Sequence, residues 1–188
     1  MHSFTKIQLP TKRLSLRPLR ASDAQAIFEL FTDPDVLRYW GTPWTSIDSA
    51  DDFIAKESEA MSTGKHVRLG IELKESGKLI GVCNLFNLSA SSRRAEVGYC
   101  LAKTAWRQGY ITESLTALLD YGFQVLDLNR VEADIDPRNV ASAKSVEAQG
   151  FVQEGYLPER WILNGEFSDS LMYGLLRSRW KPATSVAS

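Results

Sequence analysis

The chain has 188 residues, 44% of them hydrophobic, and its 22 Lys and Arg nearly balance its 23 Asp and Glu. The apolar fraction excludes a disordered chain, and the length suffices for a single domain over 1–188, with its core in about 11–176 and a frayed tail over 177–188. The net charge of −1 argues against a global positive field that would gather nucleic acid or an acidic membrane.

Both cysteines, Cys83 and Cys100, lie inside apolar runs and not at the spacing of a metal or redox motif. We therefore expect buried, reduced thiols and no metal site. The first residues contain no apolar signal-peptide core, and no stretch approaches the ~20 apolar residues of a membrane span. A cytoplasmic protein without a membrane partner is expected.

The hydrophobic period alternates along the chain between two, which is typical of strands, and about 3.6, which is typical of helices. Ser22 followed by Gln25 predicts a capping box for the first helix, and Asn164 with Gly165 predicts a hairpin turn. In chain order the sequence predicts a strand over 13–17, helices over 22–33 and 48–62, strands over 66–74, 79–88 and 94–101, a helix over 109–126, a strand over 130–136, a helix over 139–149, and paired strands over 151–162 and 166–176.

The order of these elements predicts the topology. Short turns join the three strands over 66–74, 79–88 and 94–101, so these strands must pair antiparallel. The helix over 109–126 leads from the third of them to the strand over 130–136, which requires a right-handed parallel crossover. The fold class is therefore α+β, with one mixed and mostly antiparallel sheet flanked by helices, and neither a Rossmann fold nor a barrel.

The candidate for chemistry lies where the strand over 94–101 passes into the next helix, near Gly109. The first N–H groups of a helix have no intrahelical partner, and the helix dipole adds positive potential, so such a terminus suits a phosphate. Gly109 allows close approach to the backbone, and Lys103 and Arg107 add charge. These residues indicate a candidate anion site, although many turns between a strand and a helix contain Gly and Arg.

Four short pieces of sequence follow one another from this strand onward. They are AEVGY at 95–99, WRQGY at 106–110 with Thr112 and Glu113, Asn139 with Ala141 and Ser142, and Gly150 with Phe151 and Gly155. RLSLRP at 13–18 and the residues from Asn164 through Asp169 to Tyr173 extend the pattern. In this order and spacing the chain resembles the GNAT superfamily of N-acetyltransferases, and within it the RimJ/RimL-like branch, over roughly 11–176.

The resemblance implies two central parallel strands that splay apart, with acetyl-CoA bound between them as co-substrate. Its pantetheine would bond to backbone groups of Val97, Tyr99 and Leu101, and to Asn139, for which helix N-capping is the alternative role. The family usually has Gly or Ala at position 111 and often Gly at position 107, so side-chain contacts should differ there while the N–H groups remain. The pyrophosphate would lie on the N–H groups of Arg107, Gln108, Gly109, Tyr110, Ile111 and Thr112.

The resemblance also implies three groups for acetyl transfer. Glu96 would bind the acceptor amine as general base, the backbone N–H of Tyr99 would hold the oxyanion, and Ser142 would contact the cofactor and protonate its thiolate. A solvated or ion-paired strand residue is the alternative for Glu96, and a helix-interior or capping serine is the alternative for Ser142. Glu132 and Asp134 are weaker candidates for the base.

The acceptor is expected to be a primary amine. Tyr39, Trp40 and Trp44 lie in a loop where the family shapes the acceptor pocket, although three aromatic side chains also suit a satellite core. The ribosomal branch has a carboxylate in a late strand where this chain has Trp161, and Glu159 is out of register. A protein N-terminal α-amine and a small-molecule amine stay open as acceptors, and a catalytically silent acyl-CoA sensor is the alternative function.

The remaining polar candidates carry weaker signals. The two histidines are His2, near the terminus, and His66, at a strand start, which we interpret as structural or exposed; a histidine-dependent triad is therefore not expected. Tyr173 is interpreted as core in preference to a general acid. The resemblance implies a monomer or a homodimer and no nucleic-acid partner.

Overall fold

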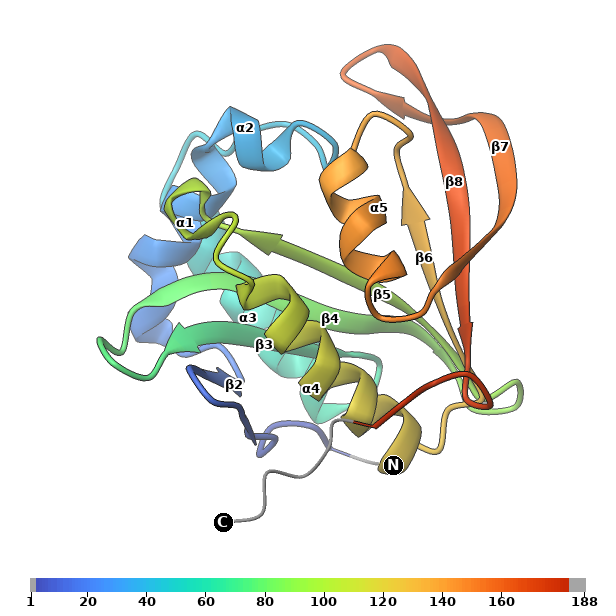
Figure 1. The fold of residues 1–188 in the computed structure, drawn as a ribbon. Helices are drawn as coiled ribbons and strands as arrows, with labels where there is room; N and C mark the ends of the chain where they lie inside the picture. Colours follow the sequence, from blue (N-terminus) through green and yellow to red (C-terminus); the bar gives the residue numbers. More distant parts are fainter. Residues whose placement is uncertain (1–2, 183–188) are drawn as a thin grey trace.

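The computed structural model describes residues 3–182, which contain an eight-stranded sheet in the order β1-β2-β3-β4-β5-β6-β8-β7 (Figure 1). The strands are β1 Leu9–Pro10, β2 Leu14–Arg17, β3 Val67–Leu73, β4 Leu79–Ser89, β5 Arg94–Leu101, β6 Arg130–Ile135, β7 Val152–Leu163 and β8 Glu166–Leu176. The helices are η1 Ala21–Asp23, α1 Ala24–Thr32, α2 Pro34–Leu37, α3 Asp48–Ser62, η2 Lys103–Ala105, α4 Tyr110–Gln124 and α5 Val140–Glu147. Among residues 3–182, none of these helices has the length and apolarity that a bilayer crossing requires.

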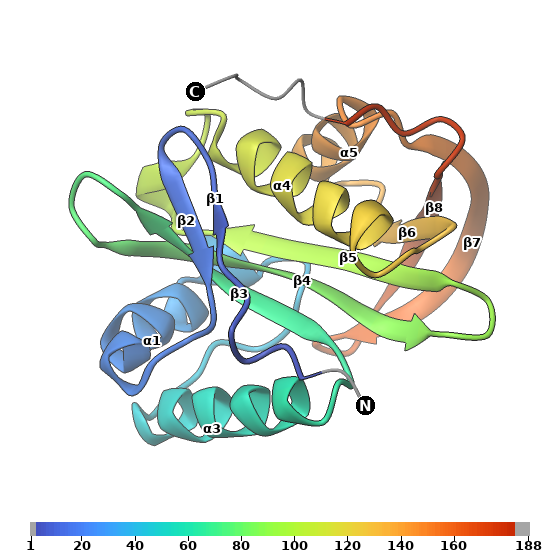
Figure 2. The same ribbon diagram turned by 90° about the horizontal axis from the view of Figure 1, so that it is seen from below.

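Helices cover both faces of the sheet, with α4 and α5 on one side and α1 and α3 on the other (Figure 2). On the first side α4 buries Leu118 and Phe123 against the sheet, and on the second α1 buries Ile27. Cys83 belongs to the first core and Cys100 to the second, both as free thiols. Both are buried, as expected, and burial raises the pKa of each thiol to about 12.

The sheet separates between β5 and β6. These neighbours are parallel and pair only at Arg94, Ala95 and Glu96 of β5, opposite residues 130–132 of β6. Figure 1 shows the two strands diverging beyond this point, with α5 in front of the gap. The other strand pairs within residues 3–182 are antiparallel, which confirms the predicted mixed sheet with splayed central strands.

The first helix begins differently from the prediction. Ser22 lies inside η1 and makes no cap, and α1 starts at Ala24. Asp23 fixes this turn instead, because its carboxylate accepts a hydrogen bond from the Arg20 N–H at 2.7 Å and is bound by the guanidinium of Arg17. The Ser22 capping box is therefore wrong, because a tertiary ion pair fixes the turn one residue later.

The expectation of a frayed tail from Arg177 is also wrong as far as residue 182. The ring of Trp180 lies 5.2 Å from that of Phe123, centroid to centroid, and its Nε1 donates to Asp120 Oδ1 at 3.1 Å. Arg177 pairs with Asp127 at 2.6 Å. The segment after β8 therefore closes over one end of α4, while residues 183–188 lie outside the described part.

Replacing Trp180 with alanine is expected to lower the free energy of unfolding by about 2 kcal/mol, because it removes both apolar burial and an aromatic pair. Urea unfolding followed by circular dichroism measures this loss. Trp180→Phe is the matched control, since it keeps a ring against Phe123 and removes only the indole hydrogen bond, so it should recover most of the loss. An unchanged unfolding midpoint in Trp180→Ala would show that the tail does not contribute.

Candidate active site

The gap between β5 and β6 exposes backbone groups of β5. The N–H of Ala102 donates to Ile80 O of β4 at 2.8 Å. In an antiparallel pair every second residue directs its N–H and C=O toward the partner strand, and the residues between them direct theirs away from it. Val97, Tyr99 and Leu101 therefore direct theirs into the gap, as the sequence predicts. The carbonyl of Leu101 accepts Trp106 Nε1 at 2.8 Å. What this edge offers a ligand is thus the peptide groups of Val97 and Tyr99 and the N–H of Leu101.

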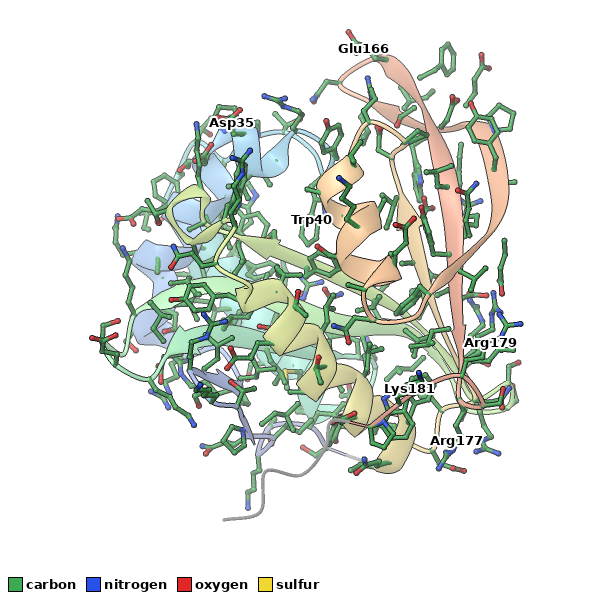
Figure 3. The ribbon with its side chains drawn as sticks, viewed as in Figure 1. Asp35, Trp40, Glu166, Arg177, Arg179 and Lys181 are labelled. Carbon is green, nitrogen blue, oxygen red and sulfur yellow. The ribbon has the colours of Figure 1, made fainter. Side chains whose placement is uncertain are left out.

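The predicted anion site is a loop with left-handed backbone that leads into α4. Arg107 has a φ of 60° and Gly109 one of 76°, which explains why the resembled family often has Gly at position 107. Lys103, expected beside this site, instead forms an ion pair with Asp35 of α2, in which Nζ lies 2.6 Å from Oδ2 (Asp35 is labelled in Figure 3). Glu113 N–H bonds to Gly109 O at 3.1 Å. Three N–H groups precede that of Glu113 in the helix, those of Tyr110, Ile111 and Thr112. They have no acceptor within the helix.

Side chains from the start of the chain hold this loop in place. Arg13 donates from Nη1 to Gln108 O at 2.9 Å and from Nε to Glu113 at 2.7 Å. Burial alone would raise the pKa of Glu113, but hydrogen bonds from Thr11 and Arg13 outweigh it and hold that pKa below its ordinary value. Ile111 packs against the first core, so its side chain does not crowd the loop.

The start of α5 faces β5 across the gap. Asn139 Oδ1 accepts the Ser142 N–H at 3.2 Å, so Asn139 is the N-cap and its amide NH₂ group remains for a second partner. Tyr99 bridges the gap, because its hydroxyl donates to the carbonyl of Ser142 at 3.1 Å. Burial raises the pKa of Tyr99 to about 12, so its phenol stays protonated. The structure thus brings Tyr99, Asn139 and Ser142 together around one opening.

A cavity of about 540 Å³ lies on the other face of the sheet, beside the same gap. Its floor is a cross-strand row in which Arg68 pairs with Asn84 and Asn84 with Gly98. A Cβ at Gly98 would lie 3.0 Å from Asn84 Oδ1 and 3.4 Å from Phe86, so glycine keeps this floor open. Glu96 belongs to the next row, where it pairs with the cavity residue Phe86.

Two carboxylates border this cavity. Glu96 Oε1 accepts a hydrogen bond from the amide of the cavity residue Asn87 at 3.0 Å and lies 3.6 Å from Arg94 Nη1, an ion pair of the kind named as the alternative role. Asp134 of β6 lines the cavity and accepts Arg160 Nε at 2.8 Å and Trp161 Nε1 at 3.1 Å. Trp161, which stands where a late-strand carboxylate was expected, therefore reaches the site by its indole and binds the carboxylate of a neighbouring strand.

Two other candidates are engaged elsewhere. Glu132 is held by Arg94 and by Arg130, whose Nε lies 2.7 Å from its carboxylate. Burial alone would raise the pKa of Glu132, but these hydrogen bonds hold it below its ordinary value. Tyr173 is 2% exposed and donates to Glu147 at 3.1 Å, so it is a core residue.

The three aromatic residues of the loop between α2 and α3 lie in different surroundings in the structure. Trp40 lines the cavity and is 40% exposed, between α2 and α5 in Figure 3. Trp44 does not line it: its ring stacks on Phe31 at 4.6 Å in the second core, which is the satellite-core alternative. Tyr39 donates to the carbonyl of Arg138 at 3.2 Å, which ties the loop to the start of α5.

Comparison with known proteins agrees with this geometry. Residues 13–152 match the family model of the acetyltransferase (GNAT) domain. The N-acetyltransferase p20 of Bacillus licheniformis is 34% identical over 92% of this chain and 97% of its own length. The ribosomal protein uS5 alanine N-acetyltransferase of Escherichia coli is 25% identical over 94% of both chains.

A solved structure of a relative contains the coenzyme. The spermidine N-acetyltransferase of Vibrio cholerae, in complex with CoA and spermine, superposes with a TM-score of 0.79 at 26% identity, over 89% of this chain and 97% of that one. Acetyl-CoA is therefore the co-substrate. The chain belongs to the GNAT family of acetyltransferases and is an acetyl-CoA-dependent N-acetyltransferase.

Proposed function

We propose that this enzyme transfers the acetyl group directly to a primary α-amine that enters from the cavity over Gly98. The observation that carries the proposal is the position of the gap. Beyond Glu96 the β5–β6 pairing stops, and Val97, Gly98 and Asp134 beside this gap line the cavity, which supports an arrangement in which cofactor and acceptor meet there. An amine in the cavity and a thioester in the gap would then approach each other without a covalent enzyme intermediate.

Acetyl-CoA supplies an activated acyl group, and the chain's own residues would orient it, stabilise the developing charge and transfer the protons. The backbone N–H of Tyr99, directed into the gap, would donate to the carbonyl oxygen as negative charge develops there. Glu96 would accept the proton that the amine loses when the C–N bond forms. The hydroxyl of Ser142 would donate a proton to the departing sulfur, and the NH₂ group of Asn139 would orient the pantetheine.

The pKa of the acceptor favours an α-amine over a lysine side chain. An α-amine has a pKa of about 8 and is partly neutral near pH 7, whereas a lysine near 10.4 must first lose its proton at a cost of about 4–5 kcal/mol. A single carboxylate such as Glu96 is enough assistance for the α-amine. The N-terminus of a peptide carries such a group, and so does a small molecule of the amino-acid type.

Release of free thiol from acetyl-CoA, measured with a panel of amines, tests the proposal. We expect release with α-amines and little with lysine side chains. Tight acetyl-CoA binding without thiol release for any amine would instead favour a catalytically silent acyl-CoA sensor. Mass spectrometry of the product identifies the acetylated nitrogen.

The two roles given to Asn139 can be separated by substitution. Asn139→Asp keeps an oxygen for the Ser142 N–H and removes the NH₂ donor, so it should leave stability unchanged and raise the Kd for acetyl-CoA about 10-fold. Asn139→Ala removes both, and should also lower the free energy of unfolding by about 1 kcal/mol. Calorimetric titration and thermal unfolding measure these effects. Unchanged acetyl-CoA affinity in both variants would leave Asn139 with capping alone.

A further inference from the structure

The cavity has more positive than negative charge, and its negative charges are already paired. Lys65 and His66, just before β3, and Arg68 of β3 line one side, and Asp134 is the carboxylate among the lining residues. Asp134 already accepts hydrogen bonds from Arg160 and Trp161. Lys65, by contrast, takes part in none of the ion pairs found among residues 3–182. A cationic acceptor such as a polyamine would meet this side with like charge.

Arg68 is held in a way that leaves donors toward the cavity. Its side chain is 16% exposed, and its guanidinium lies over the ring of Phe53 at 5.1 Å. Arg68 Nε forms an ion pair with Glu57 at 3.3 Å, but it makes no hydrogen bond there, and Glu57 is also bonded to His66. A buried guanidinium with unused donors is a site for a carboxylate, which it can bind through two parallel hydrogen bonds.

Asn84 provides a second unused polar group in the same floor. It is 3% exposed, and its Oδ1 is buried without a hydrogen-bond partner among residues 3–182. It stands between Arg68 and Gly98 in the cross-strand row. A buried acceptor left unpaired is unfavourable unless a ligand satisfies it, and a substrate N–H or ammonium would do so.

From this arrangement we propose that the acceptor is a primary amine that carries a carboxylate, with the carboxylate on Arg68 and Lys65 and the amine between Asn84 and Glu96. Arg68 lies on β3 and Glu96 on β5, with β4 between them, so the backbones of the two strands are roughly 10 Å apart. Arg68 lines the cavity, and Glu96 lies at its edge, where it accepts a hydrogen bond from the lining residue Asn87, which leaves room for an amine and a carboxylate a few bonds apart. The inference rests on the proposed function and names its substrate class.

Matched acceptors that differ only in the carboxylate test the inference. L-alanine is compared with L-alaninamide, with kcat/KM expressed per neutral amine because the amine of the free amino acid is the more basic, and an alanine-first peptide amide with glutamate at its second position is compared with the glutamine version. Spermidine is included as a cationic amine. We expect kcat/KM to be about 10- to 100-fold higher for the acid of at least one pair. The pair that responds shows whether the carboxylate belongs to a free amino acid or to an acidic peptide.

Two variants locate the effect. Lys65→Glu changes an exposed residue and should fold normally, while reducing the preference for the acid. Arg68→Gln should reduce the ratio of acid to amide to about one, chiefly by lowering kcat/KM for the acid. If Arg68→Gln unfolds, Lys65→Glu still decides the question. Lys56→Glu, on α3 and outside the cavity lining, is the matched charge control and should leave the ratio unchanged.

Binding of each acid and amide in the presence of CoA, measured by calorimetry, separates failure of the inference from failure of the proposed function. Thiol release with amines but no preference for the acids overturns the inference and leaves the function intact. Preferential binding of an acid that depends on Lys65, without thiol release, supports the inference and removes the function. Higher kcat/KM for spermidine than for every acid, or no binding of any acid, overturns the inference.

Discussion

Replacing Glu96 with glutamine is expected to lower kcat about 100-fold and to change the KM for acetyl-CoA little. Glutamine keeps an oxygen for the Asn87 amide, which donates to Glu96 Oε1 at 3.0 Å, so the strand and the cavity should stay intact. What is lost is a group that accepts the proton of the attacking amine. Steady-state kinetics at saturating acetyl-CoA measure the loss, and thermal unfolding checks the fold.

Asp134→Asn is the matched control, because Asp134 also borders the cavity but already accepts hydrogen bonds from Arg160 and Trp161. If Glu96 is the base, Asp134→Asn should retain most of the wild-type kcat. A large loss in Asp134→Asn with unchanged kcat in Glu96→Gln would assign the proton transfer to β6. Loss in neither variant would point to water as the acceptor of the proton, which an α-amine allows.

The cofactor side of the site could be predicted from the sequence because it depends on local features. A polar turn that passes through Gly109 into a helix predicts the free N–H groups, whereas the open edge of the preceding strand was implied by the family resemblance. Those N–H groups belong to the backbone, so they remain despite the departures at Arg107 and Ile111. Arg107 adopts the left-handed backbone that glycine would favour, and Ile111 packs into the first core.

The acceptor side could not be predicted in the same way, because its residues meet only through strand pairing. Arg68, Asn84 and Gly98 come from three strands and form one row only in the observed register. Alternation does place Arg68 opposite the buried Val67 and Leu69, which was a usable signal that it faces the other side of the sheet. Nothing in the sequence showed which residues would lie across from it.

Tertiary partners also explain the errors at the ends of elements. A hydrophobic period needs several residues, so β1 Leu9–Pro10 and α2 Pro34–Leu37 were too short to detect. Aromatic residues in a loop give no sign of which core they join, and Trp44 joined the second core while Trp40 faced the cavity. These outcomes depend on packing between distant segments.

The largest effect on stability is expected at a buried ion pair that joins β2 to the turn before α1. Arg17 and Asp23 are 3% and 6% exposed, and the guanidinium of Arg17 donates to both oxygens of Asp23, at 2.7 and 2.9 Å. Arg17 Nε also donates to Glu72 of β3 at 2.7 Å. Arg17→Met should lower the free energy of unfolding by about 3–5 kcal/mol, because Asp23 is left buried without its counter-charge.

The pH dependence identifies the mechanism of that loss. Burial alone would raise the pKa of Asp23, but its bonds from Arg17 and Arg20 outweigh it and hold the pKa below its ordinary value. A lowered carboxylate pKa contributes stability above the unfolded pKa of about 3.9, and this contribution disappears as the pH falls through the folded pKa. The difference in free energy of unfolding between wild type and Arg17→Met, measured with urea, should therefore have its full value near pH 7 and shrink below about pH 4.

Glu72→Gln is the control for this ion pair: it keeps an oxygen for Arg17 and should lower the free energy of unfolding by only about 1 kcal/mol. A loss in Arg17→Met that is equally large at pH 7 and pH 3 would assign it to packing of the arginine stem, and not to the charge on Asp23.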